Sequence, residues 1–165
     1  MGYKMRKQYR LPGFDYSKNG AYFITVVTHN REHLFGEIDK NEMRFSSIGK
    51  FLDDMILGLP DKLKTISVAE YQIMPNHFHM IVVIENSDKN VYENATGLRP
   101  RIKNSVSSFA NHLKRKVTRW CNENNMPFKW QARFHDKIIR NDEEYKRIAR
   151  YIQNNVLNWE NVGIY

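Results

Sequence analysis

The sequence predicts an α+β fold: a ferredoxin-like, split β-α-β antiparallel sheet with helices on one face and an added C-terminal helix. Two observations predict it. Runs of β-branched and aromatic residues alternate with helically periodic segments in the order strand, helix, strand, strand, helix, strand. The middle two strands are separated by only two residues, which indicates an antiparallel hairpin. A chain of 165 residues is about one domain long, so we expect residues 1–165 to form a single domain.

The first strand and the first helix are expected in the N-terminal third of the chain. Residues 21–30, "AYFITVVTHN", are rich in β-branched and aromatic side chains and predict a strand. Residues 45–59 carry apolar side chains at helical spacing, with Ser46 or Ser47 as the N-cap and Gly58 at the end.

A hairpin is expected next. Residues 63–74 predict a strand, residues 75–76, "PN", a tight connection, and residues 77–84, "HFHMIVVI", the partner strand. Residues 85–103 are polar and lack periodicity, so we expect a long connection.

The last third of the chain predicts two amphipathic helices around a short strand. Residues 104–125 place apolar side chains on one face and basic side chains elsewhere. Residues 134–140 predict the strand. Residues 141–155 predict the final helix, which Asn141 opens with Glu144 three residues later in a capping-box pattern.

The charge balance favours a polyanionic partner. The chain contains 26 Lys and Arg against 18 Asp and Glu, a net charge of +8 with a pI near 9.6, so nucleic acid is the leading candidate. No apolar run reaches the roughly 18 residues of a membrane span, and no signal peptide is apparent, so we expect a cytoplasmic protein with no membrane partner. Cys121 is the only cysteine, which excludes an intramolecular disulfide and a thiolate-rich zinc site.

Two histidines begin the strand at residues 77–84. Alternate side chains share one face of a strand, so His77 and His79 point the same way with Cα atoms roughly 6.5 to 7 Å apart. Two imidazoles at that spacing can converge on one metal ion, although a third ligand is needed. The alternative interpretation is a pair of ordinary histidines whose ring nitrogens bond to backbone or water.

The final helix can supply further polar groups beside this pair. Tyr151 and Asn155 are four residues apart, so they lie together on the flank of the helix, about 100° from the centre of its apolar stripe. Taken singly, Tyr151 reads as an amphipathic tyrosine with a wet hydroxyl and Asn155 as a helix C-cap. The apolar stripe consists of Tyr145, Ile148, Ala149, Ile152 and Val156.

Two stretches of the chain carry a family resemblance. "MPNHFHMIVVI" (74–84) and "WQARFHDKIIRNDEEYKRIARYIQNN" (130–155) resemble the HUH (histidine-hydrophobic-histidine) single-tyrosine transposases, especially the REP-associated and IS200-like members. The resemblance runs from "YFITVVTHNREHLFG" (22–36) through the final helix and implies that residues 1–165 form one IS200-like transposase domain. One departure is visible, because many relatives have proline where this chain has Val156.

The resemblance implies a mechanism and a set of site residues. His77, His79 and Asn155 correspond to the ligands of a divalent metal, Mg²⁺ or Mn²⁺, and Tyr151 on the final, catalytic helix corresponds to the nucleophile. The implied activity is that of a metal-dependent single-stranded DNA endonuclease and strand transferase, which acts in DNA transposition through a covalent 5′-phosphotyrosine intermediate. Relatives include both monomers and dimers, so a homodimer stays open.

Basic stretches with interleaved aromatic residues predict where single-stranded or hairpin DNA binds. They are "KMRKQYR" (4–10), "HLKRKVTRW" (112–120) and "FKWQARFHDKIIR" (128–140). A solvated helix face explains any one lysine equally well, and Trp130 reads equally as a core residue. The candidate DNA-binding residues are Lys114, Arg115, Arg119, Trp130, Arg133 and Arg140.

Two rival functions follow from the same residues. A non-catalytic nucleic-acid-binding module derived from a transposase would keep the fold and the basic charge, but the intact set of candidate catalytic residues argues against such decay. A zinc-dependent hydrolase of small phosphoesters would need only the metal site and would leave the basic surface and Tyr151 without a role.

Overall fold

The computed structural model describes residues 18–59, 65–85 and 105–159. Three expectations from the sequence fall outside the described residues: the basic stretch at 4–10, the start of the strand at 63–74, and almost all of the connection at 85–103. Among the described helices, none is long and apolar enough to cross a bilayer.

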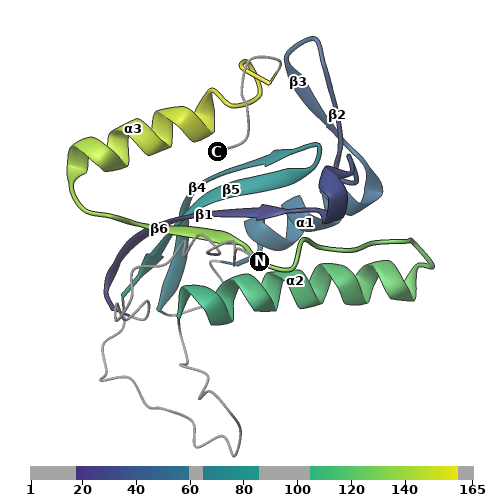
Figure 1. The fold of residues 1–165 in the computed structure, drawn as a ribbon, viewed down its shortest axis with the longest axis horizontal. Coiled ribbons are helices and arrows are strands. Elements are labelled where there is room, and N and C mark those ends of the chain that lie inside the picture. The colour runs from purple at the N-terminus through teal and green to yellow at the C-terminus, as the bar shows by residue number, and fades with distance from the viewer. Residues whose placement is uncertain (1–17, 60–64, 86–104, 160–165) are drawn as a thin grey trace, which may run out of the picture.

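Four antiparallel strands form the central sheet (Figure 1). Their spatial order is β4 (Ile66–Met74), β5 (His77–Ile84), β1 (Gly20–Val27) and β6 (His135–Ile139). The first strand of the sheet in chain order therefore lies between the third and the fourth. This is the ferredoxin-like arrangement, and the expected α+β fold is confirmed.

The helices lie on both sides of this sheet. α1 (Ser47–Leu57) and α2 (Val106–Glu123) pack against one face, and α3 (Asp142–Gln153) packs against the other (Figure 1). The expectation of two helices on one face with an added C-terminal helix is thus met, and the added helix covers the face that the other two leave open.

Alternation along the strands explains why both faces can be covered. On β5, Phe78 and Met80 belong to the large core beneath α1 and α2, whereas Ile81 belongs to a smaller cluster beneath α3. Successive side chains of a strand point to opposite faces, so β5, buried along nearly its whole length, serves both layers. The smaller cluster is completed from α3 by Ile148, Ala149 and Ile152.

A two-stranded hairpin between β1 and α1 is absent from the sequence-based expectations. It consists of β2 (Gly36–Asp39) and β3 (Glu42–Phe45), joined at Lys40 and Asn41, whose φ angles are both positive. A connection of this kind matches the twist of a hairpin. No residue of either strand is fully buried, so the sequence lacks the apolar alternation that reveals a strand.

The start of α1 is fixed against the loop that precedes the hairpin. The Ser46 hydroxyl accepts a hydrogen bond from the Gly49 amide at 3.1 Å and donates one to the Leu34 carbonyl at 2.7 Å. A Cβ atom placed on Gly49 would lie 2.0 Å from the Phe35 carbonyl oxygen. Glycine is therefore required where the helix touches this backbone.

Replacing Gly49 with alanine is expected to destabilise the protein by roughly 2 kcal/mol or more, because backbone must move to admit the methyl group. Chemical denaturation measures the loss. Lys50→Ala, one residue further along the same helix and exposed, is the control and should leave the unfolding midpoint nearly unchanged. Equal midpoints for the two variants would show that α1 does not depend on this close approach.

Candidate functional site

His77 and His79 lie side by side on the face of the sheet that α3 covers. Both are almost completely buried, with exposed fractions of 2% and 3%. Their Nε2 atoms are 3.0 Å apart, and the two rings meet edge to face. The expected convergence of the two imidazoles is therefore present in the structure.

The other nitrogen of the His77 ring is held by the turn before it. Nδ1 of His77 lies 2.6 Å from the side-chain oxygen of Asn76, whose amide group donates to the Arg31 carbonyl at 3.3 Å. This second bond orients the Asn76 amide, so its oxygen faces His77 and accepts from Nδ1. The Nε2 atom of His77 consequently carries a lone pair directed at His79.

The His79 ring is fixed from the neighbouring strand. Thr25 is its cross-strand partner on β1, and the Thr25 hydroxyl lies 2.7 Å from Nδ1 of His79. Phe23, two residues earlier on the same face, stacks on the His79 ring with centroids 5.3 Å apart. When Nδ1 of His79 donates to Thr25, its Nε2 atom is free to act as a metal ligand.

Burial keeps both imidazoles neutral near pH 7. Desolvation lowers the pKa of His77 to about 4, and the positive charge of Arg31 adds to this effect. Burial also lowers the pKa of His79 well below its usual value, with a further contribution from His77. Neutral imidazole is the form that binds metal ions.

α3 brings Tyr151 to this pair. The Tyr151 hydroxyl lies 3.2 Å from Nε2 of His79, and the rings of Tyr151 and Phe23 lie nearly perpendicular with centroids 6.2 Å apart. The apolar side chains of Ile148 and Ile152 dock the helix on Ile81 and so set this distance. Tyr145 packs at the edge of the same cluster and is only half-buried, so it is less central than the sequence suggests.

The start of α3 is capped by two side chains. The Asn141 side chain accepts from the Glu144 amide at 2.8 Å, as the sequence predicts. The Glu144 carboxylate accepts from the Arg140 amide at 2.9 Å and pairs with Lys137 at 2.6 Å. The helix is thus tied to the end of β6 as well as to the sheet beneath it.

Asn155 lies in the turn that follows α3. The C-cap of the helix is Asn154, whereas Asn155 is 2% exposed and its Nδ2 atom has no hydrogen-bond partner among the described residues. Asn155 and Tyr151 line one groove with a volume of about 390 Å³. The other residues that line it are Arg147, Arg150, Asn154 and Asn158.

These residues fit a divalent metal ion. Two metal–nitrogen bonds of about 2.1 Å that meet at a right angle span about 3.0 Å, which is the separation of the two Nε2 atoms. Rotation of the Asn155 amide exchanges its oxygen and nitrogen, so the unpaired position can present an oxygen ligand. Within the described ranges no third His, Cys, Asp or Glu joins the pair, which leaves room for water or substrate oxygens.

Several residues of the site were missed from the sequence. Thr25 and Asn76 fix the histidine rings, but each is a single polar residue whose partner depends on strand register. Trp159 lies against both His77, at a ring separation of 6.1 Å, and His33, at 5.6 Å. The one available signal in the sequence was Asn76, a side chain able to form hydrogen bonds directly before His77.

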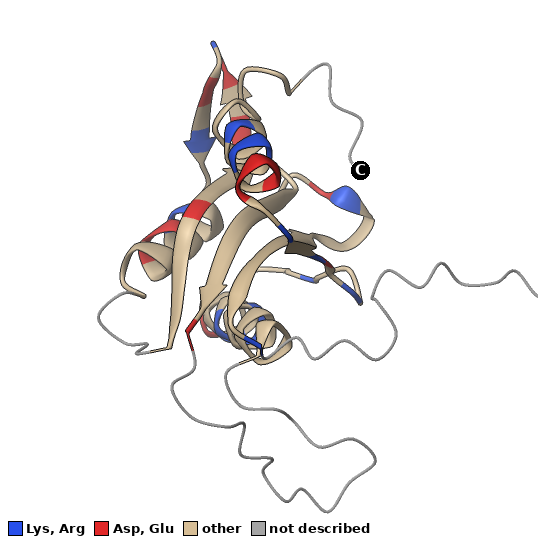
Figure 2. Ribbon diagram, turned by 90° about the vertical axis from the view of Figure 1, so that its left-hand side faces the viewer, with Lys and Arg blue, Asp and Glu red and all other residues tan. Residues whose placement is uncertain are grey.

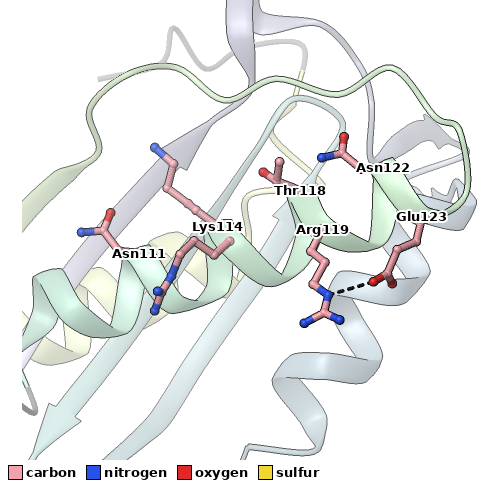
Figure 3. Close-up of a pocket in the computed structure, with 7 residues that line it drawn as sticks. Asn111, Lys114, Thr118, Arg119, Asn122 and Glu123 are labelled. Carbon is pink, nitrogen blue, oxygen red and sulfur yellow. Dashed lines mark hydrogen bonds and ion pairs between the residues drawn. The ribbon is translucent and has the colours of Figure 1, made fainter.

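Three of the candidate DNA-binding residues lie on α2, across the sheet from the histidines. Lys114, Arg115 and Arg119 line a hollow of about 610 Å³ along the polar side of the helix (Figure 3). The Lys114 ammonium donates to the Gln131 carbonyl at 2.9 Å, and burial lowers its pKa. Arg119 is paired with Glu123 at 2.8 Å. The structure does not bring this set to Tyr151.

The remaining candidates flank β6. Trp130 packs against Phe35 and Phe78, and its indole nitrogen donates to the Lys114 carbonyl at 3.1 Å, so its ring belongs mainly to the core. Arg133 and Arg140 are exposed before and after the strand. Figure 2 shows Lys and Arg on the helices at both faces, while the central strands β1 and β5 contain no charged residue.

The buried histidines make stability depend on pH. At pH 7 the His77 imidazole is mainly neutral in both the folded and the unfolded protein. Below pH 6.5 the unfolded chain binds a proton that the folded protein binds only near pH 4, so the free energy of unfolding should fall across this window by about 3 kcal/mol for His77. Urea unfolding in EDTA between pH 7 and pH 4 measures this fall. In His77→Gln the part of this fall that comes from His77 should be absent. Identical pH profiles for the variant and the wild type would show that His77 is not buried in its neutral form.

Comparisons with known proteins identify relatives of this chain. No family model matches it. A Haemophilus influenzae protein named "Uncharacterized protein" is 32% identical over 171 positions, covering 99% of this chain and 95% of the relative. A second protein of that organism, "Putative REP-associated tyrosine transposase", is 26% identical over 145 positions, covering 86% of this chain and 72% of the relative. The fold resembles that of a REP-associated tyrosine transposase bound to a REP hairpin, with a TM-score of 0.64 and 21% identity over 93% of this chain and 76% of that one. The sequence likeness supports the family of REP-associated, IS200-like tyrosine transposases, and the structural likeness agrees with it in fold.

Proposed function

We propose that this transposase-family protein is a metal-dependent single-stranded DNA endonuclease and strand transferase that acts in DNA transposition. One observation carries the proposal: the Tyr151 hydroxyl lies 3.2 Å from Nε2 of His79, which in turn lies 3.0 Å from Nε2 of His77. A potential nucleophile and a potential metal site thus share one position on the sheet. The resemblance to REP-associated tyrosine transposases supports the same chemistry.

The metal site proposed here consists of His77, His79 and Asn155, and it would hold Mg²⁺ or Mn²⁺. When bound, the ion supplies Lewis-acid stabilisation to the scissile phosphate. Asn76 and Thr25 act through the histidines, because they hold the outer ring nitrogens and leave both Nε2 atoms facing one point.

Tyr151 performs the covalent step. Its oxygen attacks phosphorus, the new Tyr–O–P bond replaces the bond from phosphorus to the 3′-oxygen, and the strand is left with a 5′-phosphotyrosine and a 3′-hydroxyl. The proton that Tyr151 loses balances the one that the 3′-oxygen gains. The ester keeps the energy of the phosphodiester, so rejoining to another 3′-hydroxyl needs no further energy source.

The proposed substrate is single-stranded or hairpin DNA. The net charge of +8 favours binding to phosphates, and the structural relative is bound to a REP hairpin. Lys114, Arg115 and Arg119 on α2 form one basic surface with Arg133 and Arg140 as further candidates. Because α2 lies on the other side of the sheet from Tyr151, this surface would contact DNA away from the cut, such as the stem of a hairpin.

Replacing Tyr151 with phenylalanine tests the covalent step. The variant keeps the ring and its packing but lacks the attacking oxygen, so it should fold, bind Mn²⁺ and bind DNA, yet form no adduct. Incubation with hairpin-bearing single-stranded DNA and Mn²⁺, followed by a denaturing gel, detects the covalent band. The non-catalytic alternative predicts no band for the wild-type protein either.

Tyr145→Phe is the matched control. Tyr145 lies on the same helix and packs against the same apolar cluster, but it has no contact with either histidine in the described structure. This variant should form the adduct at the wild-type level. An adduct that persists in Tyr151→Phe and disappears in Tyr145→Phe would assign the nucleophile to the wrong side of the helix.

Metal binding is a second, independent test of the site. The double variant His77→Ala/His79→Ala should lose detectable Mn²⁺ binding in calorimetry, and Asn155→Ala should weaken it by roughly tenfold or more, as the loss of a ligand does. His112→Ala, on α2 across the sheet, is the control and should bind Mn²⁺ like the wild type. Unchanged affinity in the double variant would remove this site.

A further inference from the structure

The groove beside Tyr151 has a chemical character of its own. It runs along one side of α3 and the turn after it, and it is lined by two arginines, three asparagines and the tyrosine itself. Arg147, Arg150 and Asn154 follow one another at spacings of three and four residues, which places them on one side of the helix. Nothing in the proposed chemistry uses Arg147, Arg150 or Asn154.

The two arginines differ in their partners. The Arg147 guanidinium lies 3.7 Å from the carboxylate of Glu144, which also pairs with Lys137. Arg150 donates only to the backbone carbonyl of Lys146, at 3.3 Å, and pairs with no carboxylate among the described residues. Within the described ranges, therefore, no carboxylate neutralises the charge of Arg150, which lies one residue before the candidate nucleophile.

A buried polar group opens onto the same groove. Asn155 is 2% exposed, and no described residue forms a hydrogen bond with its Nδ2 atom. Leaving a buried polar group unsatisfied costs about 1 to 3 kcal/mol, so the Asn155 amide is expected to be paired when metal and DNA are bound. The groove thus places the Arg150 cation beside the proposed metal ligand Asn155, and the cation favours an anionic ligand.

The length of the groove suits a nucleic-acid backbone. From Arg147 to Asn154 the helix rises about 10 Å at 1.5 Å per residue. At about 3.4 Å of axial rise per nucleotide in a stacked strand, this distance is the length of roughly three nucleotides. A guanidinium can bind a phosphate through two parallel hydrogen bonds, which fixes orientation as well as position.

We propose that this groove binds the sugar-phosphate backbone of the single strand next to the cut, and that Arg150 is a positioning residue that holds the phosphate neighbouring the scissile one. The inference rests on the proposed function, since it assigns the strand path at the same site. It separates this path from the basic surface on α2, which lies on the other side of the sheet.

The test compares Arg150→Gln with Lys146→Gln, which removes the same charge from an exposed position on α3 outside the groove. Both changes are made in the Tyr151→Phe background, so that binding is measured without cleavage. Affinity for a hairpin with a single-stranded tail is measured against salt. Arg150→Gln should bind roughly tenfold more weakly, as the loss of a charge-assisted contact does, and its log-log salt slope should be shallower by about 0.7.

A neutral methylphosphonate at the phosphate beside the cut identifies the contact. It should weaken binding to the reference protein and to Lys146→Gln but leave the affinity of Arg150→Gln nearly unchanged, because that contact is already lost. Equal salt slopes and equal methylphosphonate effects in both variants would overturn the inference.

Adduct formation with Tyr151 intact separates the inference from the proposed function. Arg150→Gln should slow single-turnover adduct formation on DNA at subsaturating concentration, and Arg150→Lys should restore part of the rate. If the wild-type protein forms no adduct but its salt slope depends on Arg150, the proposed function is refuted and the inference about the groove stands. If the adduct forms normally and neither its rate nor DNA binding depends on Arg150, the inference about the groove is refuted and the proposed function stands.

Discussion

Two neutral imidazoles buried side by side constrain the whole site. Burial depresses the pKa of His77 and His79, and each ring needs hydrogen-bond partners because water does not reach it freely. Asn76 and Thr25 meet that need on the outer nitrogens. The two Nε2 atoms then lie 3.0 Å apart with their lone pairs facing each other. A cation bound between them would remove this repulsion.

The strand that carries the histidines, β5, also explains why one face of the sheet holds the main core and the other holds the site. β5 directs Phe78 and Met80 into the core under α1 and α2, so stability comes mainly from that side. On the other face of the sheet, the histidines of β5 lie beneath α3, and a much smaller apolar cluster holds this helix in place. A helix with a modest docking surface can carry Tyr151 and a basic groove without disturbing the main core.

The strands and helices of the fold could be predicted within a few residues, because alternation on β5 and helical spacing on α1 depend only on local sequence. The hairpin β2–β3 could not, since none of its residues is fully buried. The contact of Tyr151 with His79 depends on which face α3 covers, which local periodicity does not determine. Arg150 resembles any solvated arginine on an amphipathic helix, and only the shared groove distinguishes it.

The central claim is that the two Nε2 atoms form the core of a metal site facing Tyr151. The most direct measurement is anomalous diffraction from crystals soaked in Mn²⁺. The account predicts one strong anomalous peak within bonding distance of both His77 and His79 Nε2 atoms, next to the Tyr151 hydroxyl. Ordered, unoccupied histidines in crystals that bind Mn²⁺ elsewhere would contradict it.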